Sequence, residues 1–169
     1  PQVSDHVFVV RPLEQSARSV DYIRLQRLNT VSGRAEEVDA PVHAFQWVLD
    51  ARGALRAVVT REAGLAALHV RTAAGAWKKL LEFDRFVGKG IEPKFFGPDD
   101  RLYVQAQPRG DKSAVYTLDI ETAQLSAAPL AFSEQFDLDV RPVSNAKTLL
   151  GIRFKIDAEV TQWLDANMK

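Results

Sequence analysis

The chain carries three histidines, and histidine is the side chain that most often binds a metal or moves a proton near neutral pH. They are His6, His43 and His69. None has a second histidine or a carboxylate at the spacing of H-E-x-x-H, which places two ligands on one face of a helix. The sequence therefore predicts structural histidines, no metal site and no cofactor.

Nucleophilic and phosphate-binding motifs are also missing. No G-x-S-x-G occurs, so the turn that exposes a catalytic serine in α/β-hydrolases is not encoded here. The run Gly88-Lys89-Gly90 lacks the earlier glycine and the following Ser or Thr of a phosphate-binding loop, which favours an ordinary connecting loop. The chain has no cysteine, which excludes disulfides and thiolate metal sites. We predict no catalytic residue in this chain.

Three charged residues remain as weaker candidates. Asp137 and Asp139 would point to one face of a strand, and paired carboxylates can bind metal or exchange a proton. We favour the alternative that they bond to backbone amides of a neighbouring loop. Arg56 lies inside an apolar strand pattern, where it could reach a substrate carboxylate. Pairing with an acidic residue of a neighbouring repeat is the favoured interpretation.

The elements that would position these residues follow a repeat. Leu55, Leu102 and Leu149 are spaced by 47 residues twice over. Each follows a turn-forming polar cluster that is itself preceded by an apolar pair, which predicts a β-hairpin. The clusters span residues 50–53, 97–100 and 144–147. A period of about 40 to 50 residues with several short strands is typical of the blades of a β-propeller.

Strand patterns continue through each repeat. Ala114, Tyr116, Leu118 and Ile120 share one face of a strand, as the period of two requires. Strands are predicted at residues 7–11, 22–28, 35–38, 55–59, 66–70, 102–106, 115–120, 149–154 and 160–164. Near the N-terminus the match is weaker, because Arg24 and Gln26 occupy positions that are apolar elsewhere, and a bulge or shifted register is expected.

Aromatic residues fit the same picture. Trp47, Trp77 and Trp163 are expected to pack between repeats, with ligand stacking as the alternative. In the last two repeats Tyr116 and Trp163 each stand 14 residues after the leucine that opens the strand run. This equal spacing between leucine and aromatic residue supports one supersecondary unit that is repeated along the chain.

We therefore predict an all-β fold: an incomplete β-propeller over residues 1–169, with about three and a half four-stranded antiparallel blades. The expected units are a partial blade at 2–39, blades at 40–86 and 87–134, and a partial blade at 135–169. Because a closed ring needs about four to eight whole blades, we expect a piece of a larger propeller. Its uncovered blade faces and strand edges would favour self-association.

Composition restricts the classes of partner that this chain is expected to bind. The chain has 22 basic and 22 acidic residues, scattered along its length, so a nucleic-acid partner is not expected. No apolar run approaches the roughly 18 residues of a membrane span, and no signal peptide is expected within these residues. We expect a soluble protein, cytoplasmic or periplasmic, although a chain that starts at Pro1 could have lost a leader upstream.

Several runs resemble the N-terminal propeller of bacterial serine peptidases of the prolyl oligopeptidase family, which includes dipeptidyl and acylaminoacyl peptidases. The resemblance extends from about His6 to Lys169 and is carried by residues 47–57, 77–84, 102–104, 115–119 and 149–153. In that family the propeller precedes a C-terminal α/β-hydrolase domain, whose Ser, Asp and His cut short peptides. That catalytic domain is absent from this chain, so the resemblance implies a non-catalytic part whose partners are the hydrolase domain and peptide substrates.

The resemblance also implies a role. The propeller would cap the active site, admit small or unfolded peptides and exclude folded proteins. In some members acidic residues of a propeller loop hold the N-terminal amine of the substrate, but no such motif is matched here, so the substrate-binding residues stay unknown. The main alternative is a protein-interaction scaffold with no associated enzyme. A third is a periplasmic-type propeller associated with sugars or lipoproteins.

Overall fold

A computed structural model describes residues 4–16, 19–86, 90–107, 112–135, 138–145 and 147–168, with side chains from 4–12 and from 23 onwards. These residues form thirteen β-strands and one short 3-10 helix, η1 (Ala166–Met168), and no α-helix. The all-β prediction is therefore confirmed.

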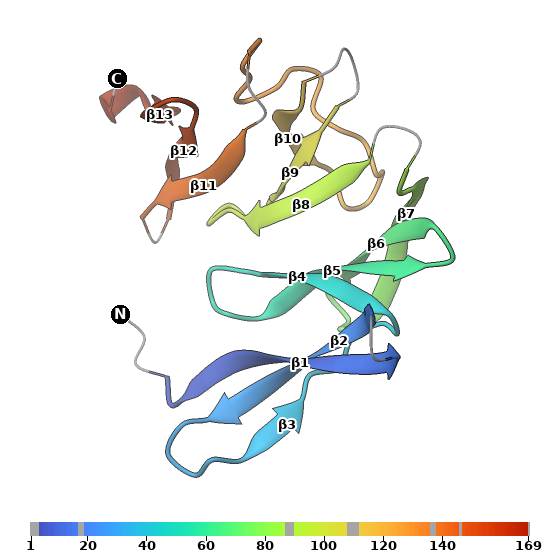
Figure 1. Ribbon diagram of the computed structural model, residues 1–169. Helices are drawn as coiled ribbons and strands as arrows, with labels where there is room; N and C mark the ends of the chain where they lie inside the picture. The colour runs from blue at the N-terminus through green and yellow to red at the C-terminus, as the bar shows by residue number, and fades with distance from the viewer. Residues whose placement is uncertain are drawn as a thin grey trace.

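The strands build four antiparallel sheets that follow one another in chain order (Figure 1). The first sheet contains β1 (His6–Ser16), β2 (Ser19–Asn29) and β3 (Ala35–Glu37). The second contains β4 (Ala44–Leu49), β5 (Leu55–Glu62), β6 (Leu65–Arg71) and β7 (Trp77–Asp84). The third contains β8 (Ile91–Phe96), β9 (Leu102–Ala106) and β10 (Ala114–Leu118), and the fourth β11 (Asp139–Ser144), β12 (Leu149–Lys155) and β13 (Glu159–Trp163).

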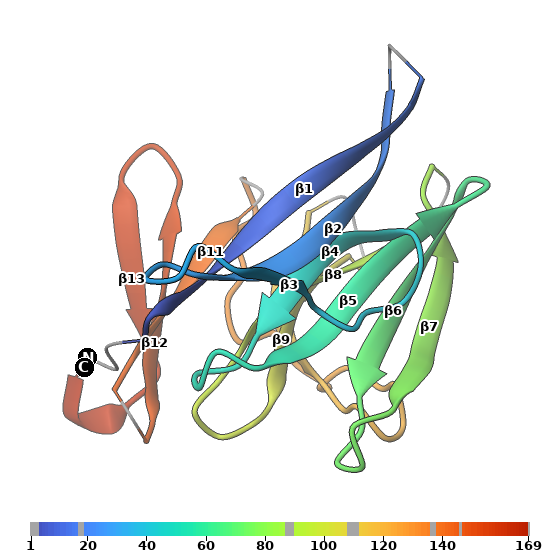
Figure 2. The same ribbon diagram turned by 90° about the horizontal axis from the view of Figure 1, so that it is seen from below.

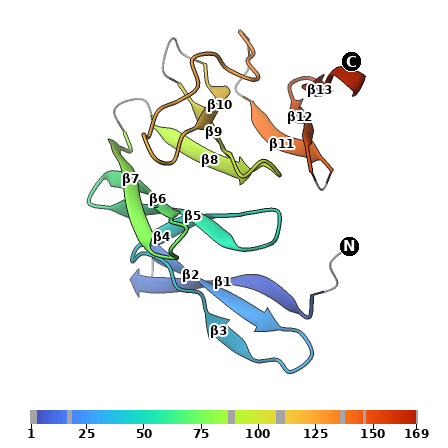
Figure 3. The same ribbon diagram turned by 180° about the vertical axis from the view of Figure 1, so that it is seen from behind.

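The sheets are stacked face to face, and their order is the same seen from behind (Figure 3). The first strands of the later sheets are neighbours, since β4 lies beside β8 and β8 beside β11. We call the end of the stack where β7 finishes and β8 begins the linker end. The opposite end, where β4 turns into β5, is the hairpin end.

The 47-residue repeat corresponds to one structural position. Leu55, Leu102 and Leu149 begin β5, β9 and β12, the second strand of each of the last three sheets. Leu55 pairs with Leu49 and Leu102 with Phe96, across the hairpins that the sequence predicts. All three leucines are buried, which explains why an apolar residue recurs at this point.

The hairpin turns are closed by short polar side chains. The carboxylate of Asp50 accepts hydrogen bonds from the backbone N–H groups of Arg52 and Ala54, at 2.9 Å each. Gly53 supplies the positive φ of 79° that this turn requires. In the fourth sheet the side-chain oxygen of Asn145 accepts from Thr148 at 2.7 Å. The polar clusters thus satisfy backbone groups that the strands leave unpaired.

The apolar cores lie between sheets. Val58 and Val59 are both buried although they are successive residues, because the second sheet has a neighbour on each face. Val58 packs with Leu25 toward the first sheet, and Val59 packs with Val104 toward the third. A third cluster, with Ile152 at its centre, fills the space between the third and fourth sheets. The fold therefore has several small inter-sheet cores.

The third sheet differs from the four-stranded blade expected at 87–134. Beyond β10 the chain makes two isolated bridges, Leu118 to Leu125 and Val115 to Ala131. The Ser126 hydroxyl accepts the backbone N–H of Thr117, at 3.3 Å. Pro129, between the two bridges, has no N–H to give to a ladder. Contacts of this kind replace the fourth strand.

The first sheet also differs from the prediction. β1 and β2 have 11 residues each, longer than the stretches predicted at 7–11 and 22–28. Their hairpin projects beyond the other sheets at the linker end (Figure 2). The expected register shift occurs around Glu14, near the hairpin tip, whereas Arg24 keeps its register and pairs with Glu37 at 3.0 Å.

Candidate functional site

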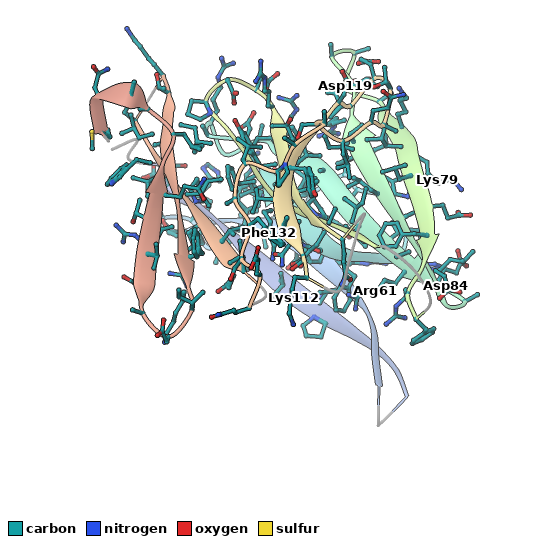
Figure 4. All side chains as sticks on the ribbon, turned by 90° about the horizontal axis from the view of Figure 1, so that it is seen from above. Arg61, Lys79, Asp84, Lys112, Asp119 and Phe132 are labelled. Carbon is teal, nitrogen blue, oxygen red and sulfur yellow. The ribbon has the colours of Figure 1, made fainter. Side chains whose placement is uncertain are left out.

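An open cleft lies between the second and third sheets at the linker end, with a volume of about 670 Å³. We call it the inter-sheet cleft. It is defined here by Phe45, Arg61, Asp84, Glu92 and Gln105, which come from β4, β5, β7, β8 and β9. Figure 4 shows Arg61 and Asp84 at the same end of the second sheet. The cleft therefore combines charged, aromatic and amide side chains from both sheets.

A β-bulge places the aromatic residue of the cleft. The register between β4 and β5 shifts at Phe45, because Ala44 pairs with Thr60 and Gln46 with Val59. The extra residue turns the Phe45 side chain away from the regular alternation, which is a common use of bulges near binding sites. Phe45 is consequently half exposed at the cleft and lies beneath the guanidinium of Arg61.

Arg61 is the central cation of the cleft. Its guanidinium carbon lies over the Phe45 ring, 3.3 Å from the centroid. Burial lowers the pKa of Arg61, the nearby charge of Arg85 lowers it further, and Glu92 opposes both effects. Among the described residues no carboxylate forms an ion pair with Arg61. The cleft therefore contains a partly desolvated cation with which no carboxylate of the described residues forms an ion pair.

Amide side chains form the other wall of the cleft. The Gln46 amide donates to the carbonyl oxygen of Pro93 at 2.9 Å, which links β4 to β8. The Gln105 amide donates to the Ser113 hydroxyl at 2.5 Å. The Gln105 oxygen Oε1 is buried and has no partner among the described residues. Like the Trp47 nitrogen described below, this oxygen is closed off from solvent, so the wall of the cleft is formed by the amide contacts and not by a free acceptor.

Two smaller cavities lie on the other face of the second sheet. One, of about 250 Å³ between the first and second sheets, is lined by Leu25, Val38 and Trp47. The indole N–H of Trp47 is buried there without a partner among the described residues. Since that nitrogen is closed off from solvent, a ligand in the cavity has no direct access to it.

The second of these cavities, of about 410 Å³, holds a hydroxyl and an imidazole. Thr60 Oγ1 and His69 Nε2 are 3.1 Å apart. Burial lowers the pKa of His69, and the charge of Lys79 lowers it further, so the ring is neutral at pH 7. Within the described part of the chain no carboxylate hydrogen-bonds the His69 ring, so this pair lacks the third member of a catalytic triad.

The three histidines, for which the sequence predicts structural roles, each have a different partner. His6 lies 3.3 Å from the Asn29 amide, and His43 lies 3.4 Å from the Glu62 carboxylate. His69 contacts Thr60 as described above. No group of three metal-binding side chains gathers within the ranges described. Each histidine instead has a partner within its own sheet.

The paired carboxylates and the glycine loop are only partly described. Asp137, Gly88 and Lys89 lie outside the described residues, so these hypotheses stay predictions. Asp139 begins β11, is exposed, and stands opposite Lys155 of β12. Gly90 directly precedes β8, where an added Cβ would come 3.3 Å from the Phe83 ring.

Arg56 pairs with the neighbouring sheet, which confirms the favoured interpretation. Its guanidinium donates to the Asp100 carboxylate at 2.7 Å and lies 3.7 Å from Asp50. It also covers the Phe96 ring, at 4.9 Å from the centroid. The hydrogen bond to Asp100 raises the pKa of Arg56. Arg56 therefore serves the packing of the second sheet on the third at the hairpin end.

The tryptophans divide into two groups. Trp47 and Trp77 pack against the core between the first and second sheets, as predicted. Trp163 packs within its own sheet, against Gly151 on the adjacent strand. A Cβ added to Gly151 would lie 3.1 Å from the Trp163 ring and 2.8 Å from the backbone oxygen of Gln162. Glycine is thus required at this position by close approach of the neighbouring strand.

Sequence reasoning missed Phe45, Arg61 and Gln105. The stretch beginning at Arg61 reads as a polar break between strands, and a bulge at Phe45 has no local signature. One signal was available, because Gln46 and Pro93, which meet across the cleft, are spaced by 47 residues. The repeat length identifies them as equivalent positions of neighbouring sheets.

Comparisons with known proteins add no relative. No family model matches the chain, and neither the curated proteins nor the solved structures contain a match to it. In the described parts of the chain, no helix has the length and apolar character needed to cross a membrane.

Proposed function

We propose that this chain is a non-catalytic part of a β-propeller that gates and orients peptide substrates for a separate α/β-hydrolase domain. The parent protein would be a serine peptidase of the prolyl oligopeptidase family. In this proposal the four sheets are about three and a half blades, and β4, β8 and β11 surround the propeller axis. Support comes from the 47-residue repeat of hairpins and from the adjacency of these three strands.

The inter-sheet cleft is the observation on which the function depends. An extended peptide offers alternating N–H and C=O groups together with a charged terminus. The cleft offers the Arg61 guanidinium, which suits a charged terminus, and the Phe45 ring within one opening. Such a site suits a flexible chain that can enter a gap between sheets, and it excludes a folded domain by size. Substrate alignment of this kind accelerates a reaction carried out elsewhere.

The codons that follow Lys169 in the gene provide a direct test. We expect a G-x-S-x-G motif there, followed by an Asp and then a His, in the order of α/β-hydrolases. The purified chain should not hydrolyse a dipeptide amide, whereas the parent protein should. A gene that ends without a hydrolase domain, or turnover by the isolated chain, would contradict the proposal.

A scaffold for protein partners is the second candidate. Large apolar side chains are exposed at the linker end, notably Val42 at 79% and Phe86 at 78%. Phe132 is exposed as well, and Figure 4 shows its position. Apolar groups that solvent reaches are typical of surfaces that another protein covers. Further blades in place of a hydrolase domain downstream would favour this function.

A further inference from the structure

We propose that the inter-sheet cleft recognises a carboxylate of its peptide ligand, and that Arg61 is the residue that binds it. The inference rests on the proposed function, since it names the chemical group by which a peptide is held. The most direct source of this group is the C-terminal carboxylate of a short peptide.

The first argument is the state of the Arg61 charge. A cation that has lost part of its hydration is costly unless an anion or hydrogen-bond acceptors replace the water. Arg56, at the other end of the same strand, has two carboxylates within 4 Å. Arg61 has none among the described residues, and the charge of Arg85 is added nearby. The cleft therefore favours entry of a negatively charged group.

The second argument is the orientation of the guanidinium. The position of the guanidinium carbon over the Phe45 ring, 3.3 Å from the centroid, restricts where the group can lie. A stacked guanidinium still directs its N–H groups outward along its edge, where a planar carboxylate can accept two of them. The aromatic ring thus prepares Arg61 for bidentate binding and reduces the entropy lost when a ligand binds.

The third argument distinguishes a carboxylate from a phosphate. Asp84 and Glu92 line the same cleft and would repel a doubly charged anion more strongly than a singly charged one. Glu92 is also held by Lys94, at 2.8 Å, which directs part of its charge away from Arg61. A single carboxylate balances Arg61 without exceeding the positive charge of the site.

The experiment compares two forms of one peptide. The tripeptide Ala-Ala-Phe is titrated into the ¹⁵N-labelled chain as its free acid and as its C-terminal amide, and both affinities are measured by NMR. We expect the acid to shift the signals of residues around Arg61 and to bind about tenfold more tightly than the amide, the size of one charge-assisted hydrogen-bonding contact. An amidated peptide that contains one Glu tests whether a side-chain carboxylate also suffices.

Two variants separate the role of Arg61 from general charge. Arg61→Gln removes the cation, and it should make the acid and the amide bind equally. Arg52→Gln is the matched control, because Arg52 is exposed in the turn at the opposite end of the sheet. This control should preserve the tenfold preference. Arg61→Lys keeps the positive charge but lacks the planar guanidinium, so this variant should retain only part of the preference for the acid.

The outcomes distinguish this inference from the proposed function. Equal binding of acid and amide by the unmodified chain would overturn carboxylate recognition and leave peptide binding intact. A preference that survives Arg61→Gln would assign the carboxylate to another residue and overturn the inference as well. Absence of binding by either peptide would contradict both.

Discussion

Tyr103 shows how burial changes the chemistry of a single side chain. Its ring stacks on Phe95, with 4.8 Å between the centroids, in the core between the third and fourth sheets. Its hydroxyl donates to the Asp99 carboxylate at 3.1 Å. Burial raises the pKa of Tyr103 to about 12, and the negative charge of Asp99 contributes to the increase. The neutral phenol is thus the form that the fold stabilises.

We predict a specific alkaline titration for this residue. Absorbance at 295 nm should show a component with a pKa of about 12 in the unmodified chain. Tyr103→Phe should remove that component, and Tyr116→Phe should leave it. In the unfolded chain a tyrosine ionises near pH 10. Between that pH and about 12 the unfolded state binds fewer protons than the folded state, so the free energy of unfolding must fall as pH rises.

The loss can be measured by urea unfolding at several pH values. The difference of about two pKa units corresponds to at most about 3 kcal/mol, complete near pH 12. Tyr103→Phe starts from a lower stability because it lacks the bond to Asp99, but its decline with pH should be shallower. Parallel declines for the two proteins would show that Tyr103 ionises normally.

At the scale of single residues, the sequence predicted the partner of a charged side chain best where the surrounding residues of the strand are all apolar. Arg56 interrupts an apolar strand, so a charged partner was required, and the structure supplies Asp100. Arg61 stands where a strand meets a turn, and there a charge is expected in solvent. Its partial burial depends on the bulge at Phe45 and on a neighbouring sheet, which no local pattern encodes.

The elements derive their stability from packing against neighbouring sheets, and β6 shows this on a single strand. Leu68 is fully buried in the core between the second and third sheets. Leu65, three residues earlier on the same strand, is 43% exposed. The two leucines have the same intrinsic strand propensity, so any difference between them reports burial.

We predict that Leu68→Ala lowers the free energy of unfolding by about 2 to 5 kcal/mol, because it leaves a cavity in a close-packed interior. The control Leu65→Ala should cost less than about 1 kcal/mol. Chemical denaturation monitored by tryptophan fluorescence measures both. Similar losses for the two variants would mean that the second and third sheets do not pack together as described.

Regular elements were predictable and irregular ones were not. The hairpins at 50–53, 97–100 and 144–147 combine an apolar repeat with turn chemistry, so two independent signals agree. The fourth strand expected in the third sheet does not form a regular ladder. The Ser126 hydroxyl accepts the Thr117 N–H in place of a backbone carbonyl, and Pro129 has no N–H to donate. The length of the β1–β2 hairpin escaped prediction because its polar positions do not follow the two-residue alternation.

The whole molecule is a stack whose two outer sheets each have a face that no other described sheet covers (Figure 1). On the first sheet, β1 is an edge strand with Val7, Phe8 and Val10 at least one third exposed. Apolar edge strands pair readily with further strands. This arrangement agrees with the self-association that the sequence predicts, which stays a prediction.

We expect the apparent mass measured by size-exclusion chromatography with light scattering to rise with protein concentration. Val10→Lys introduces a charge on the β1 edge, where Val10 is 57% exposed, and should shift the equilibrium toward monomer. Val31→Lys is the matched control in a turn, with Val31 79% exposed, and should change nothing. A monomer at every concentration would contradict the prediction.

The outer margin of the third sheet affects where ordered aggregation of the chain could start. Ordered aggregates grow when a continuous row of free backbone amides templates an incoming strand. The stretch from Leu125 to Ala131 pairs with β10 through two isolated bridges and a few separate hydrogen bonds, and it contains Pro129. This margin cannot seed a fibril without first rearranging. The outer strands β1, β7 and β13 each pair on one side only within their sheets, so seeding experiments should be directed at those strands.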